Sequence, residues 1–323
     1  MIEQNIMFSV IIPLYNKASY IQLAVESVLK QTYVDFELII VNDGSSDDSL
    51  NVVQSFRDSR LRIISQKNQG VSASRNNGVL MAQHEYIAFL DGDDWWDPTF
   101  LEKMAVLIVS HPAAGIYGCQ YFWVKNGKQK CSINHEPSGF AGYFDYFVGY
   151  MYAWWMPLTS ISVVIRKSVF EEMRGFKTNL KFGEDFDLWV RIALAYPVAY
   201  LNEPLAFYNQ DVIPADRALG GKRWRLQEHF LFNLEFLREA EQTNPILKRL
   251  LDGLKVRGLL KFYLRNDYSP EVAAILEQVD FSKQPRYYQR IYTWPKSLIK
   301  LYFRGKKVGS NAKQSLRKSL KSP

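Results

Sequence analysis

The sequence FSVIIPLYNKASYIQLAVESVLKQTYVDFELIIVNDGS, residues 8–45, holds a strand, a helix and a second strand, and it decides the fold. Residues 8–12 and 36–41 are apolar, β-branched runs, a pattern that predicts strands buried on both faces. Between them, residues 21–29 carry apolar side chains at helical spacing. A helix that joins two such strands is typical of a parallel pair.

The same alternation continues along the chain. Further strands are predicted at residues 61–64 and 86–90, and helices from residue 46, at 72–82 and at 98–109. This order predicts an α/β fold with a mostly parallel central sheet and helices on both faces. In such sheets ligands bind beyond the carboxyl ends of the strands, so functional residues are expected there.

The second half of the chain departs from the strand–helix alternation of the first half. Asn126-Gly127 predicts a hairpin, residues 161–165 a strand and residues 185–196 a helix. From about residue 222 the pattern is helical, with one apolar face over residues 226–237. We therefore expect an α/β domain at residues 1–220 and a helical, basic C-terminal region at residues 221–323.

Three carboxylates follow the strand at residues 86–90 as Asp91-Gly92-Asp93-Asp94. Adjacent carboxylates repel one another unless a cation or hydrogen-bond donors neutralise them. Their oxygens are hard ligands that suit Mg²⁺ or Mn²⁺, ions that also bind substrate phosphates. The motif therefore predicts a divalent-cation site, and a solvated acidic turn is the alternative.

Two other motifs place acids where a ligand would bind. Asp43 follows the strand at residues 36–41 and is able to accept hydrogen bonds from a uracil-type ring or a ribose hydroxyl. Glu184 and Asp185 begin the helix predicted at residues 185–196. A carboxylate there is a candidate general base, while helix capping is the alternative.

Together these motifs resemble the family 2 inverting glycosyltransferases, which have the GT-A fold. The resemblance covers roughly residues 7–210, with five motifs in the family's order. They are residues 9–16 (SVIIPLYN), 37–47 (ELIIVNDGSSD), 68–76 (NQGVSASRN), 90–94 (LDGDD) and 183–185 (GED). The fold that this resemblance implies is a Rossmann-like GT-A domain.

The resemblance also implies roles for individual residues. It assigns nucleotide binding to Pro13, Tyr15, Asp43, Arg75 and Asp91. Asp93 would coordinate Mg²⁺ or Mn²⁺, Asp185 would be the catalytic base, and Glu184 would position the acceptor. One departure concerns the loop after residues 205–208, which in relatives often carries Arg or His over the donor. Here the cations come later, at Arg217, Lys222 and Arg223.

The implied activity is metal-dependent transfer of a sugar from a nucleotide-diphosphate donor, with a UDP-sugar expected. The acceptor would be a hydroxyl of a saccharide or lipid-linked saccharide, in the synthesis of a bacterial surface polysaccharide or glycolipid. One carboxylate base and one displacement imply inversion. A non-catalytic sugar-nucleotide-binding protein on this fold is the alternative, but it would lose Asp93 or Asp185. A dinucleotide-binding protein would need a glycine-rich loop after the first strand, which is absent from the sequence.

Composition bears on the cellular location. Only two cysteines occur, Cys119 and Cys131, which argues against a disulfide-rich secreted protein and for a reducing cytosol. The N-terminus does not have the pattern of a signal peptide. The uncharged residues 146–165 are long enough for a membrane span, but Pro157 and the polar residues favour a buried strand with an aromatic loop.

Positive charge is concentrated at the C-terminus. The net charge is +7, yet twelve Lys and Arg and no acid follow Asp280. Aromatic and aliphatic residues alternate with these cations between Arg290 and Lys307, which suits an amphipathic segment on an anionic membrane. We expect a cytoplasmic protein, peripheral to the inner face of the membrane, with a solubilising tail as the alternative. No motif indicates nucleic-acid binding.

Overall fold

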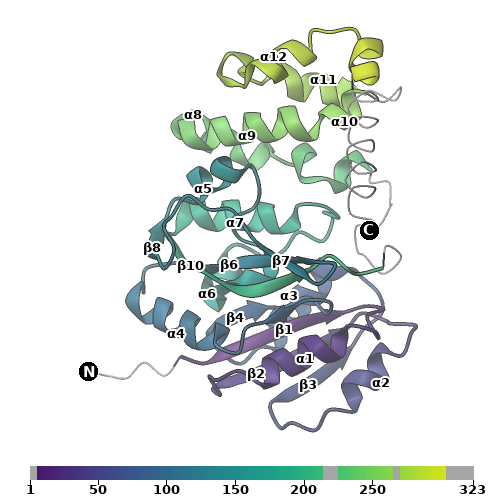
Figure 1. Ribbon diagram of the computed structural model, residues 1–323, viewed down its shortest axis with the longest axis vertical. Coiled ribbons are helices and arrows are strands. Elements are labelled where there is room, and N and C mark those ends of the chain that lie inside the picture. The colour runs from purple at the N-terminus through teal and green to yellow at the C-terminus, as the bar shows by residue number, and fades with distance from the viewer. Residues whose placement is uncertain (1–5, 214–224, 265–269, 303–323) are drawn as a thin grey trace, which may run out of the picture. The chain divides into compact units, whose positions relative to one another are not determined.

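The structure, a computed structural model, describes residues 6–213, 225–264 and 270–302 (Figure 1). The chain divides into two compact units, residues 1–230 and 231–323. The predicted domain boundary between residues 220 and 221 lies outside the described residues, so the predicted domain limits stay a prediction. Each unit is described by itself.

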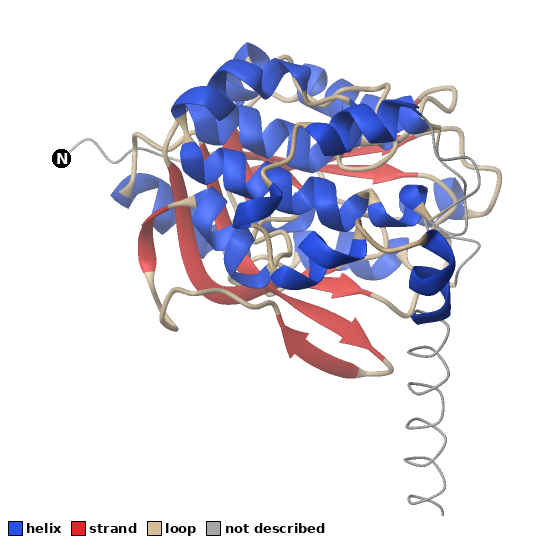
Figure 2. Ribbon diagram, turned by 90° about the horizontal axis from the view of Figure 1, so that it is seen from above, coloured by secondary structure: helices blue, strands red, loops and turns tan. Residues whose placement is uncertain are grey.

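The first unit is built on one ten-stranded sheet, whose strands are red in Figure 2. Its order is β3-β2-β1-β4-β9-β6-β10-β5, with β7 paired to β6 and β8 to β10. Neighbours are parallel from β3 to β4 and between β6 and β10, while β9 runs antiparallel between β4 and β6. The strands are β1 Phe8–Leu14, β2 Phe36–Asn42, β3 Leu61–Ser65, β4 Tyr86–Phe89, β5 Trp95–Trp96, β6 Ile116–Lys125, β7 Lys128–Cys131, β8 Ala141–Phe144, β9 Val163–Arg166 and β10 Val198–Asn209.

Helices cover both faces of this sheet. Val10 and Ile12 of β1 belong to the core cluster that includes α1 and α4, whereas Ile11 faces α3, where Gly78 approaches its side chain. Because side chains alternate along a strand, this division places α3 on the opposite face. The predicted fold class is thereby confirmed. The helices are α1 Ile21–Leu29, α2 Ser49–Gln54, α3 Val71–Met81, α4 Phe100–Ser110, α5 Tyr146–Ala153, α6 Lys167–Glu172 and α7 Glu184–Ala195.

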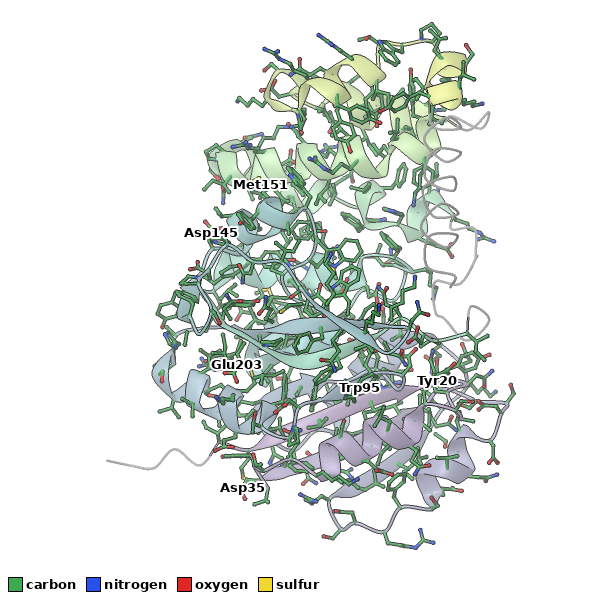
Figure 3. The ribbon with its side chains drawn as sticks, in the orientation of Figure 1. Tyr20, Asp35, Trp95, Asp145, Met151 and Glu203 are labelled. Carbon is green, nitrogen blue, oxygen red and sulfur yellow. The ribbon has the colours of Figure 1, made fainter. Side chains whose placement is uncertain are left out.

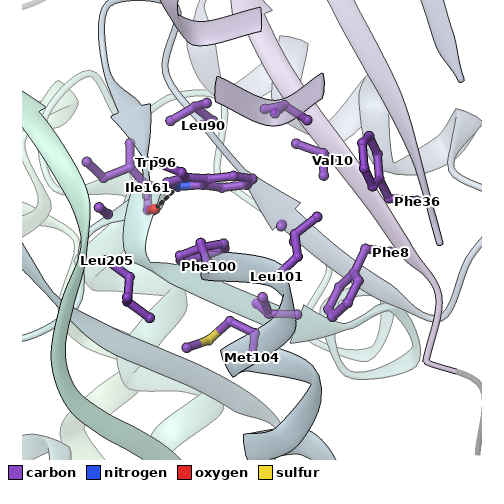
Figure 4. Close-up of a cluster of buried hydrophobic side chains, with 14 of the residues drawn as sticks. Phe8, Val10, Phe36, Leu90, Trp96, Phe100, Leu101, Met104, Ile161 and Leu205 are labelled. Atoms are coloured by element: carbon purple, nitrogen blue, oxygen red, sulfur yellow. Dashed lines mark hydrogen bonds between the residues drawn. The ribbon is translucent and has the colours of Figure 1, made fainter. Parts of the chain in front are cut away.

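Figure 4 shows the core next to the acid motif. The rings of Trp96 and Phe100 stack with centroids 4.1 Å apart, and Trp96 Nε1 donates a 2.7 Å hydrogen bond to the Ile161 carbonyl oxygen. Both rings are almost completely buried, and Trp96 lies two residues after Asp94. This packing gives the Asp91–Asp94 turn a rigid base.

Two sequence-based expectations were wrong in detail. Residues 226–237 form three short 3₁₀ turns instead of one α-helix. The cause is pairing of this segment with the chain before α7, where Phe230 N donates to Phe182 O and Phe182 N to Glu228 O. Residues 146–165 begin with helix α5 where an aromatic loop was expected, whereas β9 confirms the strand predicted at residues 161–165. No described helix is both long and apolar enough to cross a membrane.

The second unit is helical in its described part, as predicted. Its helices are α8 Arg238–Thr243, α9 Pro245–Gly258, α10 Leu260–Tyr263, α11 Pro270–Glu277 and α12 Arg286–Ile291. Asn244 caps α9 by accepting hydrogen bonds from the backbone N–H groups of Ile246 and Leu247. The apolar stripe of α9 is buried at Leu247, Leu250, Leu251 and Leu254. Residues 303–323 of the basic tail lie outside the described residues.

Candidate active site

The loops after β1 and β2 are joined by side-chain hydrogen bonds. Asn16 takes a left-handed φ of 50°, and its Oδ1 accepts a 2.8 Å hydrogen bond from Ser46 N. Lys17 N donates to Ser49 Oγ at 2.7 Å. These bonds fix the end of β1, where Pro13 is buried and the Tyr15 side chain is 47% exposed. Of these two predicted nucleotide-binding residues, only Tyr15 presents its ring to solvent.

Asp43 is buried at the end of β2, where it accepts three hydrogen bonds. Its Oδ1 accepts hydrogen bonds from Gln66 Nε2 and Gln69 N, and its Oδ2 accepts one from Gly70 N, all at 2.8 Å. Gly70 immediately precedes α3 and has a φ of 91°, which favours glycine. Asp43 therefore holds the loop after β3 and the start of α3 against the end of β2.

The acids after β4 each have a different partner. Asp93 Oδ2 accepts a 2.7 Å ion-pair hydrogen bond from Lys17 Nζ. Asp94 is 2% exposed; its Oδ1 accepts from Asn209 N at 2.7 Å, and its Oδ2 has no hydrogen-bond partner among the described residues. Burial raises the pKa of Asp93, with Lys17 opposing the shift and Asp91 adding to it. Burial, Asp93 and Asp91 also raise the pKa of Asp94 well above its usual range.

Arg75 connects the acid motif to the start of α7. The Arg75 side chain is only 3% exposed; its Nη2 donates to Asp91 Oδ1 at 2.6 Å and its Nη1 to Glu184 Oε1 at 3.4 Å. Burial opposes the charge on Arg75, but the carboxylates of Asp91 and Glu184 outweigh it and raise the pKa of the guanidinium. Arg75 Nε has no partner among the residues that the structure describes. One buried cation thus joins residues from three separate sequence motifs.

Asp185 lies in the first turn of α7, after Gly183 with a left-handed φ of 82°. Its Oδ1 accepts a 2.8 Å hydrogen bond from Phe186 N. Burial raises the pKa of Asp185 to about 7; the negative charge of Glu184 adds to the shift and Arg75 opposes it. A carboxyl group of that pKa is able to accept a proton near neutral pH, as a general base must.

Four tyrosines lie within electrostatic range of Asp185. Burial raises the pKa of the phenols of Tyr121, Tyr146, Tyr150 and Tyr208, and the charge of Asp185 contributes at each. Tyr121 OH donates to Met156 O at 3.1 Å, whereas Tyr146 OH has no partner among the described residues. The sequence did not single out these residues, since tyrosines far apart in the chain resemble ordinary core residues.

The residues of the acid motif fit a divalent cation. Among the described residues, no three Asp, Glu, His or Cys side chains are grouped closely enough to enclose a metal ion. A cation that keeps water and phosphate ligands needs fewer protein groups, and Mg²⁺ behaves in this way. Asp93 offers an oxygen now held by Lys17, and the Oδ2 of Asp94 is buried without a partner in the described part of the chain. Both are hard donors of the kind that Mg²⁺ and Mn²⁺ prefer.

Two residues near the site, Asp187 and Lys17, were not singled out from the sequence. Asp187, two positions after Asp185, is a buried structural residue, paired with Lys177 at 2.7 Å and Arg191 at 2.6 Å. Arg191 lies four residues later on the same helix, a spacing that could have revealed this pair. Lys17 was missed because a lone lysine in a loop carries no sequence signal. Arg217, Lys222 and Arg223 lie outside the described residues.

Comparisons with known proteins agree on one family. The model of the family described as "Glycosyl transferase family 2" matches residues 9–173. EpsH of Bacillus subtilis (strain 168), a protein named as a glycosyltransferase, is 43% identical over 98 residues. That match spans 30% of this chain and 28% of EpsH, so the chain covers well under two thirds of that relative's length.

Solved structures share the fold. S. aureus TarS (residues 1–349), solved in complex with UDP-GlcNAc, gives a TM-score of 0.67 at 18% identity, covering 86% of this chain and 83% of that one. The mannosyltransferase PcManGT from Pyrobaculum calidifontis, solved with GDP-Man and Mn²⁺, gives 0.55 at 15% identity, covering 93% and 80%. At these identities the likeness establishes the GT-A fold alone.

Proposed function

The chain belongs to glycosyl transferase family 2, and from this premise we propose that it transfers a sugar from a nucleotide-diphosphate donor to a hydroxyl acceptor, with inversion. One observation carries the proposal: residues from three distant motifs meet around the start of α3. Asp43 accepts a hydrogen bond from Gly70 N, and Arg75 bonds both Asp91 and Glu184. This arrangement supports one site for nucleotide, diphosphate and acceptor.

The nucleotide would bind at the ends of β1 and β2. The half-exposed ring of Tyr15 is available to stack on the base, and Pro13 shapes the strand end beneath it. Asp43 and Arg75 would hold the nucleotide, with Asp91 toward the ribose or the metal. We propose a UDP-sugar, since TarS was solved with UDP-GlcNAc; the GDP-Man of PcManGT makes a GDP-sugar the rival.

Asp93 would hold the divalent cation, with Asp91 and Asp94 beside it. When bound, Mg²⁺ or Mn²⁺ neutralises charge that develops on the leaving diphosphate. Lys17 now pairs with Asp93 and would have to release that oxygen. Its ammonium group would then lie within reach of the negative diphosphate.

Asp185 would accept the proton of the attacking hydroxyl as the new bond forms. Glu184 would position the acceptor while its hydrogen bond holds Arg75. We place no second carboxylate as a nucleophile, so a single displacement with inversion follows. A non-catalytic sugar-nucleotide-binding protein would not need a base whose pKa is about 7 at this position.

The test is a thermal-shift panel of UDP- and GDP-sugars with and without Mn²⁺, followed by assays of transfer. We expect one class of sugar nucleotide to stabilise the protein, more strongly with Mn²⁺. Asp185→Asn should keep this stabilisation and lose transfer by about 10²- to 10⁴-fold. Normal transfer by this variant, or full wild-type activity in excess EDTA, would remove the proposed base or the proposed metal.

We further propose an acceptor on a bacterial surface polysaccharide or glycolipid, and a cytoplasmic enzyme peripheral to the membrane. The described end of the basic tail supports it, because Trp294, Leu298 and Leu301 are exposed among lysines. Full-length protein should co-sediment with anionic liposomes, and a chain truncated near residue 285 should not. Equal sedimentation of the two proteins would remove the membrane proposal.

A further inference from the structure

A pocket of about 200 Å³ lies within the first unit, apart in sequence from the acid motifs. It is formed by the β6–β7 hairpin together with the end of α5 and the turn after it. The lining residues that matter here are Trp123, Lys130, Ser132, Ala153, Trp154 and Trp155. Three indoles and two polar side chains in one small concavity are the composition of a binding site, since such sites combine aromatic walls with a few polar groups.

The indoles of Trp123 and Trp155 form the aromatic wall. Their ring centroids are 4.8 Å apart and their planes meet at 53°, so each ring supports the other. Trp155 is still 49% exposed, an unusual exposure for so large an apolar side chain. The pair therefore presents a supported aromatic surface to a ligand.

The local backbone holds these rings in place. Asp145, labelled in Figure 3, caps α5 by accepting hydrogen bonds from Phe147 N and Val148 N. At the other end of α5, Trp154 takes a left-handed φ of 51°. For a bulky residue this conformation is costly, and such strain is concentrated at functional sites.

A chain of aromatic rings connects this pocket to the candidate active site. Trp123 stacks on Tyr121, with centroids 6.3 Å apart and planes at 15°, and meets Tyr208 edge to face at 6.3 Å. Tyr121 and Tyr208 are two of the tyrosines close enough to Asp185 to be affected by its charge. Contacts between aromatic rings thus lead from the pocket to tyrosines on which the charge of the proposed base acts.

We infer that this pocket is an acceptor subsite, which binds a sugar ring of the acceptor other than the one that is glycosylated. The C–H face of a pyranose is apolar and packs on an indole, while its hydroxyls need polar partners at the edge. Lys130 and Ser132 supply an ammonium and a hydroxyl group there. The inference rests on the proposed function and adds that the acceptor is an oligosaccharide or a glycan chain.

An anionic lipid surface is the rival occupant, since Ile133, which also lines the pocket, and Tyr152 on α5 are exposed. The concave shape and the polar groups inside the pocket favour a sugar. A membrane contact would instead use exposed apolar side chains outside the pocket, such as Tyr152. The experiment therefore includes both ligands.

The probes are the methyl glycosides of glucose, galactose, N-acetylglucosamine and rhamnose. Their binding to the full chain is measured by saturation-transfer NMR. We expect at least one glycoside to bind, and Trp155→Ala to weaken it by about tenfold, the effect of one lost aromatic contact. Trp155→Phe should restore most of the binding. Tyr143→Ala is the matched control, because Tyr143 is 50% exposed on β8 of the same unit and does not line the pocket.

UDP binding, measured by thermal shift, distinguishes failure of the proposed function from failure of the acceptor subsite. Failure of the wild type to bind any sugar nucleotide or UDP would defeat the proposed function itself. UDP binding without any glycoside binding, or equal glycoside binding by Trp155→Ala, would overturn the subsite alone. Loss of liposome binding in Trp155→Ala with glycoside binding unchanged would assign the pocket to lipid instead.

Discussion

The proton-accepting role proposed for Asp185 makes transfer depend on pH in the range where this carboxyl group titrates. Burial, reinforced by Glu184 and opposed by Arg75, raises the pKa of Asp185 to about 7. The value of kcat/KM follows the ionised fraction of the base in the free enzyme. Between about pH 6 and pH 8 that fraction rises from about one tenth to about nine tenths, so kcat/KM should rise about tenfold.

Glu184→Gln tests the electrostatic part of this reasoning. Removing the charge of Glu184 removes the second-largest cause of the raised pKa and leaves Arg75, which acts in the opposite direction. The pKa of Asp185 should fall, and the rise in kcat/KM should move to lower pH. Glu171→Gln is the matched control, since Glu171 is on α6 in the same unit with its side chain 57% exposed.

The assay is release of UDP at constant ionic strength, measured over the same pH range with circular dichroism as a check of folding. The wild type and Glu171→Gln should share one profile. Asp185→Asn should lose both most of the rate and the rising limb. A wild-type profile that is flat across this range, or a Glu184→Gln profile that coincides with it, would refute the assignment.

Three other perturbations follow from the structure. The folded state holds the proton of Asp185 more tightly than the unfolded state, so ionisation of Asp185 lowers the free energy of unfolding as pH rises from about 4 to about 7. Asp185→Asn should therefore melt at a higher temperature than the wild type at about pH 8. This difference in melting temperature should become smaller toward about pH 5. Lys17→Met should raise Mn²⁺ affinity several-fold in the absence of nucleotide, because Asp93 loses its 2.7 Å ammonium partner. Unchanged Mn²⁺ affinity in a calorimetric titration would contradict the assignment of Asp93 as a metal ligand. Gly78→Ala would place a Cβ 2.4 Å from Ile11 Cγ2 and should lower the free energy of unfolding by about 1–3 kcal/mol in urea, whereas Leu80→Ala on the exposed side of α3 should not.

The sequence predicted the first half of the sheet well because its signals are local. β1 and β2 are completely buried over seven residues each, so their apolar runs are unambiguous. The insertion of β9 between β4 and β6 depends on pairing across about 50 to 80 residues, which no local pattern specifies. The 3₁₀ turns over residues 226–237 were misjudged for the same reason, since the backbone of Phe182 overrides the local helical pattern.

Within the candidate site, sequence and structure contribute different knowledge. The motifs identified the acidic residues, but their ion-pair partners come from distant parts of the chain and meet them only in the folded structure. Arg75 lies 16 residues from Asp91 and 109 from Glu184, and Lys17 lies 76 from Asp93. Asp185 and Asp187 are nearly equivalent in sequence, yet only Asp187 has two ion-pair partners that make it structural.

Under the proposed function, the charges of the site predict that metal and donor bind together. Asp91, Asp93 and Asp94 face two cations, Lys17 and Arg75, and the second oxygen of Asp94 has no partner among the described residues. A divalent cation alone must displace an ammonium group that is 88% shielded from water, and a diphosphate alone adds negative charge to an acidic cluster. If both were bound, the diphosphate would balance the charge of the cation and that of the displaced Lys17. Each ligand would therefore make the binding free energy of the other more favourable by the same amount, which is the reciprocity that any such coupling requires.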